Sequence, residues 1–230
     1  MTRFYENYQR VLENVEKACN RVNRDISEIT VVAVSKTFPV EVIKEAYEAG
    51  IRIFGENYAQ ELRDKSKFLK DYDISWHFIG RIQLNKLKYI VPVSDLIHSV
   101  SRLEELEKID LLAEKFNKIQ EILIQVNISG EETKSGLKPE LIRDFIYKSK
   151  DFKNIRIVGL MTMAPFTDDE KIIRKVFSDL RKLRDDLIKD FPEIRHLSMG
   201  MSNDYQIAVE EGATILRIGT AIFGERKYDN

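Results

Sequence analysis

Lys36 is the residue of this sequence whose position most directly suggests chemistry, because it closely follows a run of apolar, mostly β-branched residues. Residues 30–34 form that run, and their nearly continuous hydrophobicity predicts a strand buried on both faces. A lysine amine is costly to bury at the end of such a strand. Partial desolvation there favours the neutral amine, which can attack an aldehyde. The alternative is that Lys36 simply begins a loop, with its amine in solvent.

Two segments further along the chain have the composition of phosphate-binding loops. In residues 217–221, Gly219 would let backbone N–H groups approach an anion closely, and Thr220 adds a hydroxyl. Residues 200–204 supply another glycine, the Ser202 hydroxyl and a helix start. Phosphate sites of (β/α)₈ barrels frequently use the loops after strands seven and eight. Together with Lys36, these loops indicate a site for a phosphorylated aldehyde, although two ordinary turns would have the same composition.

Other polar residues give weaker indications of a functional site. Asn57 follows the second apolar run, where it could meet a ligand or cap a helix. His77 and His98 lie in expected strands without spaced partners, so we interpret them as structural and expect no metal site. Ser198 and Ser202 lack the G-x-S-x-G pattern of a hydrolase nucleophile. No P-loop or G-x-G-x-x-G dinucleotide pattern occurs in the sequence.

Short apolar runs alternate with longer amphipathic segments, and this alternation predicts a fold in which strands alternate with helices. The strands are expected at eight places, which are 30–34, 51–54, 75–79, 96–99, 121–127, 155–161, 196–198 and 214–218. Apolar residues recur at helical spacing from Phe4 to Val22. The same periodicity returns between the expected strands, at 42–49, 59–69, 103–116, 141–149 and 172–187. Eight βα units of this size predict a single (β/α)₈ TIM barrel with an extra N-terminal helix, forming one domain over residues 1–230. A doubly wound open sheet is the alternative.

The composition limits the partners to be considered. Lysine and arginine number 37 against 38 acidic residues, so the net charge of −1 argues against nucleic acid as the main partner. Cys19 is the only cysteine, which excludes an intrachain disulfide. No apolar run approaches the length of a membrane span, and the first residues lack a signal-peptide pattern. We therefore expect a cytoplasmic protein that does not bind membranes.

Several ordered blocks of the sequence closely resemble the pyridoxal phosphate homeostasis proteins, which are relatives of the N-terminal barrel domain of alanine racemase. The blocks run through nearly the whole chain, and they are VAVSKTFPVEVI (32–43), FGENYAQEL (54–62), WHFIGRIQLNK (76–86), VNISGEETKSGL (126–137), GLMTMAP (159–165) and HLSMGMSNDYQIAVEEGATILRIGTAIFGER (196–226). The third block departs from the family at Arg81 and Leu84, as does Ser101 in HSVSR. These departures leave the expected cofactor site undisturbed.

The resemblance implies roles for individual residues. Lys36 would carry pyridoxal 5′-phosphate, the phosphorylated aldehyde form of vitamin B6, as a Schiff base. Ser202, Gly219 and Thr220 would hold the phosphate, and Arg217 would face the pyridine nitrogen. Asn57 would lie near the ring, and Met163 would pack beside the cofactor where racemases carry a histidine. Lys134 is a candidate second attachment lysine, although an exposed loop lysine is the simpler interpretation.

The resemblance also favours a function. It implies a non-catalytic protein for pyridoxal phosphate homeostasis that stores, buffers or delivers the cofactor, with pyridoxal-phosphate-dependent apoenzymes as recipients. A monomer is expected, since the second domain of the racemases is missing from the pattern. An arginine at the pyridine nitrogen keeps that nitrogen unprotonated, and the ring is then a poor electron sink. The alternatives are a weak amino-acid racemase, with Tyr58 as the nearest candidate for a second base, and a regulatory module acting through protein partners.

Overall fold

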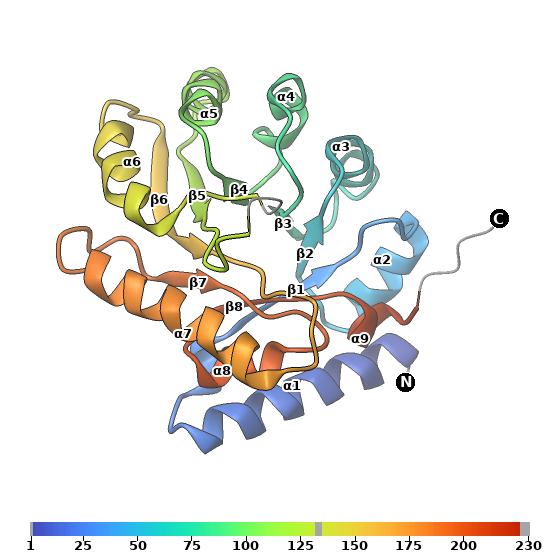
Figure 1. Cartoon of the computed structure of the whole chain (residues 1–230). Helices are drawn as coiled ribbons and strands as arrows, with labels where there is room; N and C mark the ends of the chain where they lie inside the picture. The colour runs from blue at the N-terminus through green and yellow to red at the C-terminus, as the bar shows by residue number, and fades with distance from the viewer. Residues whose placement is uncertain (1, 132–134, 226–230) are drawn as a thin grey trace.

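Eight parallel strands close into a barrel in the computed structural model of the protein, which describes residues 2–131 and 135–225 (Figure 1). Neighbours in the sheet follow the chain order, and β8 pairs with β1 to close it. The strands are β1 (Thr30–Val34), β2 (Ile53–Glu56), β3 (Ser75–Phe78), β4 (Leu96–Val100), β5 (Gln120–Gln125), β6 (Ile155–Met161), β7 (His196–Ser198) and β8 (Ile215–Ile218). The predicted TIM barrel is confirmed, and the open sheet is excluded.

Helices follow the strands and surround the barrel (Figure 1). In the described part of the chain they are α1 (Arg3–Arg21), α2 (Val40–Glu48), α3 (Ala59–Phe68), α4 (Leu87–Ile90), α5 (Leu103–Lys115), α6 (Ile142–Ser149), α7 (Glu170–Leu187), α8 (Tyr205–Glu210) and α9 (Thr220–Phe223), with 3₁₀ turns at Ile26–Glu28, Leu84–Lys86 and Pro139–Leu141. The sequence pattern did not predict α4, because four residues are too few to display a helical period. Within residues 2–131 and 135–225, each helix is too short or too polar to cross a bilayer.

The second strand begins two residues later than its apolar run predicts. Ile51 is buried but lies outside the strand, directly after the turn at Gly50, whose φ is +99°. The apolar run therefore includes a residue that packs in the core before strand pairing starts. The strand extends instead to Glu56, a fully buried carboxylate.

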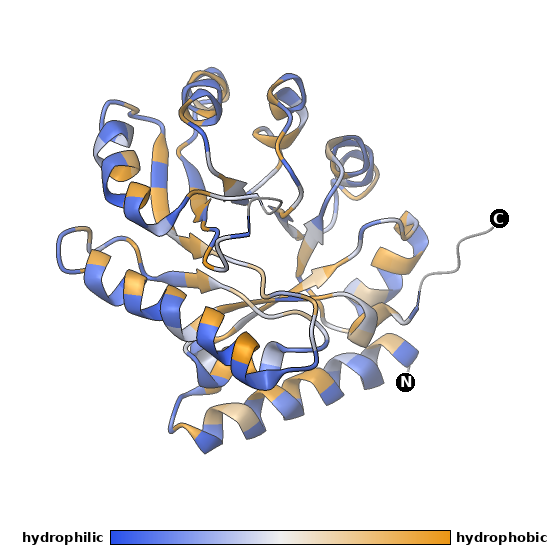
Figure 2. Ribbon diagram, viewed as in Figure 1, coloured by the Kyte–Doolittle hydropathy of each residue, from blue (hydrophilic) through white to orange (hydrophobic). Residues whose placement is uncertain are grey.

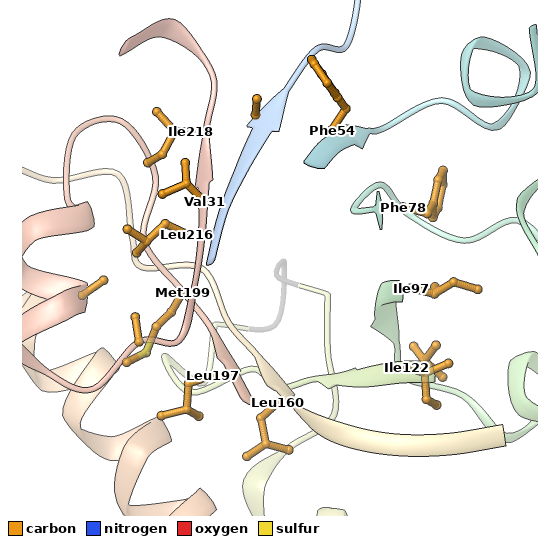
Figure 3. Close-up of a cluster of buried hydrophobic side chains, with 14 of the residues drawn as sticks. Val31, Phe54, Phe78, Ile97, Ile122, Leu160, Leu197, Met199, Leu216 and Ile218 are labelled. Carbon is orange, nitrogen blue, oxygen red and sulfur yellow. The ribbon is translucent and has the colours of Figure 1, made fainter. Parts of the chain in front are cut away.

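Strand residues alternate between the helix side and the barrel interior. Leu216 and Ile218 belong to the main core between sheet and helices, as do the labelled strand residues of Figure 3. The orange faces of the helices in Figure 2 show the other half of this core. A second apolar cluster comes from the strand residues Val32, Leu96, Leu123, Val158, Met161 and Ile215. Alternation along β8 then directs Arg217 into the barrel, on the opposite face of the strand from its two apolar neighbours.

The N-terminal helix α1 lies beside α8 and α9 (Figure 1). Arg3 donates from Nη2 to the carbonyl oxygen of Phe223 at 2.8 Å, and Asn7 donates from Nδ2 to that of Ile222 at 2.8 Å. The rings of Phe4 and Phe223 pack with centroids 5.8 Å apart. The start of the chain therefore holds α9, the short helix that follows β8, in place.

Gly159 allows β6 and β7 to approach closely, and we predict that Gly159→Ala destabilises the barrel. A Cβ there would collide with the backbone carbonyl of His196, so a strand must shift. We expect a loss of about 3 kcal/mol in unfolding free energy, measured by denaturant titration. Gly50→Ala is the control, because it has open space and only the strain of positive φ, worth about 1 kcal/mol. Equal losses in the two variants would contradict the steric argument.

Candidate functional site

The C-terminal ends of the parallel strands meet at one mouth of the barrel, and most of the predicted site residues lie there. Lys36 follows β1 and Asn57 follows β2, and both are partly buried. Ser202 follows β7, while Gly219 and Thr220 follow β8. Since barrel active sites occupy this mouth, the fold brings together the residues that the sequence singled out.

Direct contacts connect the loops after β7 and β8 to the end of β1. The Ser202 hydroxyl accepts a hydrogen bond from the N–H of Ala221 at 3.2 Å, which joins the two loops. A methyl group at Gly219 would lie 3.7 Å from the Cβ of Val34 and 3.8 Å from its carbonyl oxygen. The turn at Gly219, which caps α9, therefore lies next to the strand that ends just before Lys36.

Two further candidates follow β6 and β2 at the same mouth and are more exposed to solvent. Met163 lies on the loop after β6, with 42% of its surface exposed. Tyr58 is 53% exposed at the N-terminal end of α3. Lys134 lies outside the described residues.

Arg217 is buried inside the barrel, with 4% of its surface exposed. Its Nη1 donates to the Ser198 hydroxyl at 2.5 Å and its Nη2 donates to the carbonyl oxygen of Thr162 at 2.9 Å. Burial lowers the pKa of Arg217 to about 10, and the nearby Asp204 opposes that shift. The guanidinium is still charged at neutral pH, so a fixed cation lies within the barrel.

Behind Arg217, a chain of hydrogen bonds crosses the barrel interior. His98 Nδ1 lies 2.9 Å from the Ser198 hydroxyl, and His98 Nε2 lies 3.0 Å from His77 Nδ1. Arginine can only donate, so these contacts are all hydrogen bonds when Ser198 donates to His98 and His98 donates to His77. Burial lowers the pKa of His77 to about 4 and that of His98 well below its ordinary value. Both imidazoles are therefore neutral and orient Arg217 without adding charge.

A second buried network bonds to the residues on either side of Lys36, and the sequence pattern did not reveal it. Lys65 Nζ lies 2.7 Å from Glu56 Oε1 and 2.7 Å from Glu61 Oε2, and it donates to the carbonyl oxygen of Ser35 at 2.9 Å. The Ser35 hydroxyl donates to Glu56 at 2.6 Å. One signal was available, because Lys65 lies three residues after Leu62 and four before Leu69, on the apolar face of α3.

Among the described residues, no cluster of three or more histidine, cysteine, aspartate or glutamate side chains is suited to a metal ion. The polar groups at the mouth are a lysine amine, hydroxyls, an amide and a guanidinium. This donor set suits an anionic organic ligand with an electrophilic carbon.

The fold and the sequence define the class of this protein. The family model described as "Alanine racemase, N-terminal domain" matches residues 7–227. A crystal structure of an unknown protein from Bifidobacterium adolescentis is 34% identical, with a TM-score of 0.91, and the match covers 96% of this chain and 94% of that one. The protein is thus a barrel of the alanine racemase N-terminal-domain class.

The particular family follows from named relatives. The pyridoxal phosphate homeostasis protein of Aquifex aeolicus (strain VF5) is 46% identical over 224 residues, covering 97% of this chain and 98% of the relative. The structure of PipY from Synechococcus elongatus PCC7942, described with PLP bound, is 33% identical with a TM-score of 0.81 and covers 92% of this chain and 100% of that one. The chain belongs to the pyridoxal phosphate homeostasis protein family, which confirms the resemblance found in the sequence.

The neutral, buried His77 predicts a loss of stability in acid. Its pKa is below the unfolded value of 6.5, so the unfolded state takes up the proton first. The stabilisation is complete above pH 6.5 and is lost as the pH falls to about 4, at a cost on the order of 3 kcal/mol.

Chemical unfolding of wild type and His77→Gln across this pH range measures the effect. We expect a flatter pH dependence in His77→Gln. In the control His196→Gln, which changes an exposed histidine, the dependence should stay closer to wild type. An unchanged slope in His77→Gln would contradict the assignment.

Proposed function

We propose that this protein holds pyridoxal 5′-phosphate on Lys36 and acts in pyridoxal phosphate homeostasis by storing, buffering or delivering the cofactor. One arrangement carries the proposal: Lys36 follows β1, Gly219 in the loop after β8 lies against the end of that strand, and Ser202 in the loop after β7 is hydrogen-bonded to the same loop. The names of the relatives and the PLP-bound PipY structure support the same ligand.

The residues present fit the chemistry of this ligand. Ser202 and Thr220 offer hydroxyl donors to a phosphate, and Gly219 leaves the backbone accessible because it carries no side chain. Arg217 would face the pyridine nitrogen from inside the barrel. Asn57 would lie near the ring, and the exposed Met163 would cover the ligand from the loop after β6.

Pyridoxal phosphate would supply an aldehyde, whose C=O bond is replaced by a C=N bond to a lysine nitrogen as water leaves. Lys36 would provide the neutral amine, with both amine protons passing to the departing oxygen. Asn57 and the loops after β7 and β8 would orient the ligand, so that the reacting carbon lies within reach of the amine.

Arg217 is the reason to propose retention of the cofactor without catalysis. Arg217 donates to Ser198 and Thr162 and stays protonated at neutral pH. It can donate a hydrogen bond to a nitrogen that faces it but does not transfer a proton, so that nitrogen stays unprotonated. The neutral histidines behind it hold this orientation. We also propose that the protein is a cytoplasmic monomer and that apoenzymes dependent on pyridoxal phosphate are its recipients.

We predict that Lys36→Ala abolishes the covalent adduct. Wild-type protein incubated with pyridoxal phosphate should show a visible absorbance band, and borohydride should fix one pyridoxyl group to Lys36, located by peptide mass spectrometry. The control Lys171→Ala removes an exposed lysine at the start of α7 and should behave as wild type. An adduct of unchanged stoichiometry in Lys36→Ala would refute the assignment.

A weak racemase is the competing activity, and it requires proton transfer on both faces of the substrate α-carbon. Tyr58, the candidate for the second face, is half exposed at the N-terminal end of α3. We predict that alanine and serine exchange their α-proton with deuterated solvent no faster with the loaded protein than with free pyridoxal phosphate. Proton NMR measures the exchange, and a protein-dependent rate that disappears in Lys36→Ala would establish catalysis.

A further inference from the structure

We infer that Glu56, Lys65 and Glu61 form a clamp that positions Lys36 for capture of the aldehyde, an inference that rests on the proposed function. These three residues, from the end of β2 and from α3, are called the clamp below. None of them is among the residues expected to touch the ligand. Their role is to fix the backbone from which the Lys36 side chain extends.

The clamp bonds to the residues on both sides of Lys36. Before Lys36, the carbonyl oxygen of Ser35 accepts from Lys65 Nζ at 2.9 Å, and the Ser35 hydroxyl donates to Glu56 Oε1 at 2.6 Å. After it, the N–H of Thr37 donates to Glu61 Oε2 at 2.8 Å. Three contacts therefore constrain a three-residue segment, and the middle residue is the proposed attachment site.

The backbone of this segment is strained. Thr37 has a φ of +69°, in the left-handed region that a β-branched residue rarely occupies. Such a conformation costs on the order of 1–3 kcal/mol and persists only where the surroundings enforce it. The bond from Thr37 to Glu61 and the hold on Ser35 provide that enforcement, so loosening the clamp should let the segment relax.

The clamp is costly to bury, which argues against a purely structural role. The Glu56 side chain is fully buried and that of Lys65 is 8% exposed, while Glu61 is 30% exposed. Desolvation raises the pKa of Glu56 to about 7, against the opposing effect of Lys65. Replacing a buried ion pair with apolar residues is often neutral or stabilising. More precise placement of the Lys36 backbone would give a reason for keeping the buried charges of Glu56 and Lys65.

Precision matters here because bond formation depends on alignment. A misplacement of about 1 Å can reduce the rate of a reaction between positioned groups by about a hundredfold. Binding of the phosphate would depend on the loops after β7 and β8, whereas the clamp contacts described above go to Ser35 and Thr37 after β1. Loss of the clamp should therefore slow covalent capture and leave non-covalent binding nearly intact.

Two ligands separate these effects in the full-length protein. Pyridoxal 5′-phosphate reports covalent capture, through the rate at which borohydride-stable adduct forms on Lys36. Pyridoxine 5′-phosphate has an alcohol in place of the aldehyde, so calorimetry with it reports non-covalent binding alone. The apparent melting temperature of the ligand-free protein reports stability.

The main variant is the double substitution Glu56→Gln with Lys65→Met, which removes both buried charges and keeps the volume of the side chains. We expect the capture rate to fall about tenfold to a hundredfold, while the affinity for pyridoxine 5′-phosphate changes by less than about threefold. Lys118→Met is the matched control. Lys118 also donates to two carbonyl oxygens, those of Val91 and Ser94, but away from Lys36, and its removal should leave the capture rate unchanged.

A milder pair of variants keeps the test valid if the double variant does not fold. Glu61→Ala leaves the Glu56–Lys65 pair intact and removes the acceptor of the Thr37 N–H, together with the contact between Glu61 and Lys65. We expect slower capture in Glu61→Ala and recovery toward the wild-type rate in Glu61→Gln, whose amide oxygen can still accept.

The outcomes distinguish this inference from the proposed function. Wild-type capture rates in the double variant and in Glu61→Ala would overturn the clamp and leave the proposed function standing. A parallel loss of capture, pyridoxine 5′-phosphate binding and melting temperature would reduce the network to a structural role and overturn the clamp as well. Absence of any adduct on Lys36 in the wild-type protein would overturn both.

Discussion

The pairing of β8 with β1 is the constraint on which the rest of this molecule depends. In that register Ala33 lies opposite Ile218, so the residues that follow each strand emerge side by side at the mouth of the barrel. Lys36 comes three positions after Ala33, and Gly219 comes one position after Ile218. A shift of one residue in this pairing would turn Arg217 toward the helices and remove the cation from the barrel interior.

The interior of the barrel has an apolar part and a polar part. Apolar residues such as Val32, Leu123 and Ile215 fill part of it and supply packing. The remainder holds His77, His98 and Arg217 in a connected hydrogen-bond chain. Burying polar groups is costly unless they are hydrogen-bonded, and this chain links its members by hydrogen bonds without a second charge. It leaves the guanidinium fixed in direction before any ligand arrives.

Much of the fold and part of the site could be predicted from local sequence. Buried strands such as 30–34 are visible in a few consecutive residues, and Lys36 stands out because it follows one. The proposed phosphate loops could be placed at one mouth of the barrel once eight βα units were counted. The pairing of Glu56 with Lys65 could not be foreseen, because it depends on how α3 packs beside the end of β2. His77 and His98 were assigned a structural role, but their link to Arg217 through Ser198 requires four strands, β3, β4, β7 and β8, to be placed in space.

The contacts of α1 with α9 connect the two ends of the described chain. Arg3 and Asn7 hold the backbone at Ile222 and Phe223, immediately behind the turn that follows β8. A chain emerging from the ribosome exposes Lys36 early, but it meets Gly219 and Thr220 only when nearly all of the barrel has been made. Closure of such long-range contacts is the slow part of folding a barrel. The proposed cofactor site is therefore assembled last, and a truncated or half-folded chain would leave Lys36 as an ordinary surface amine.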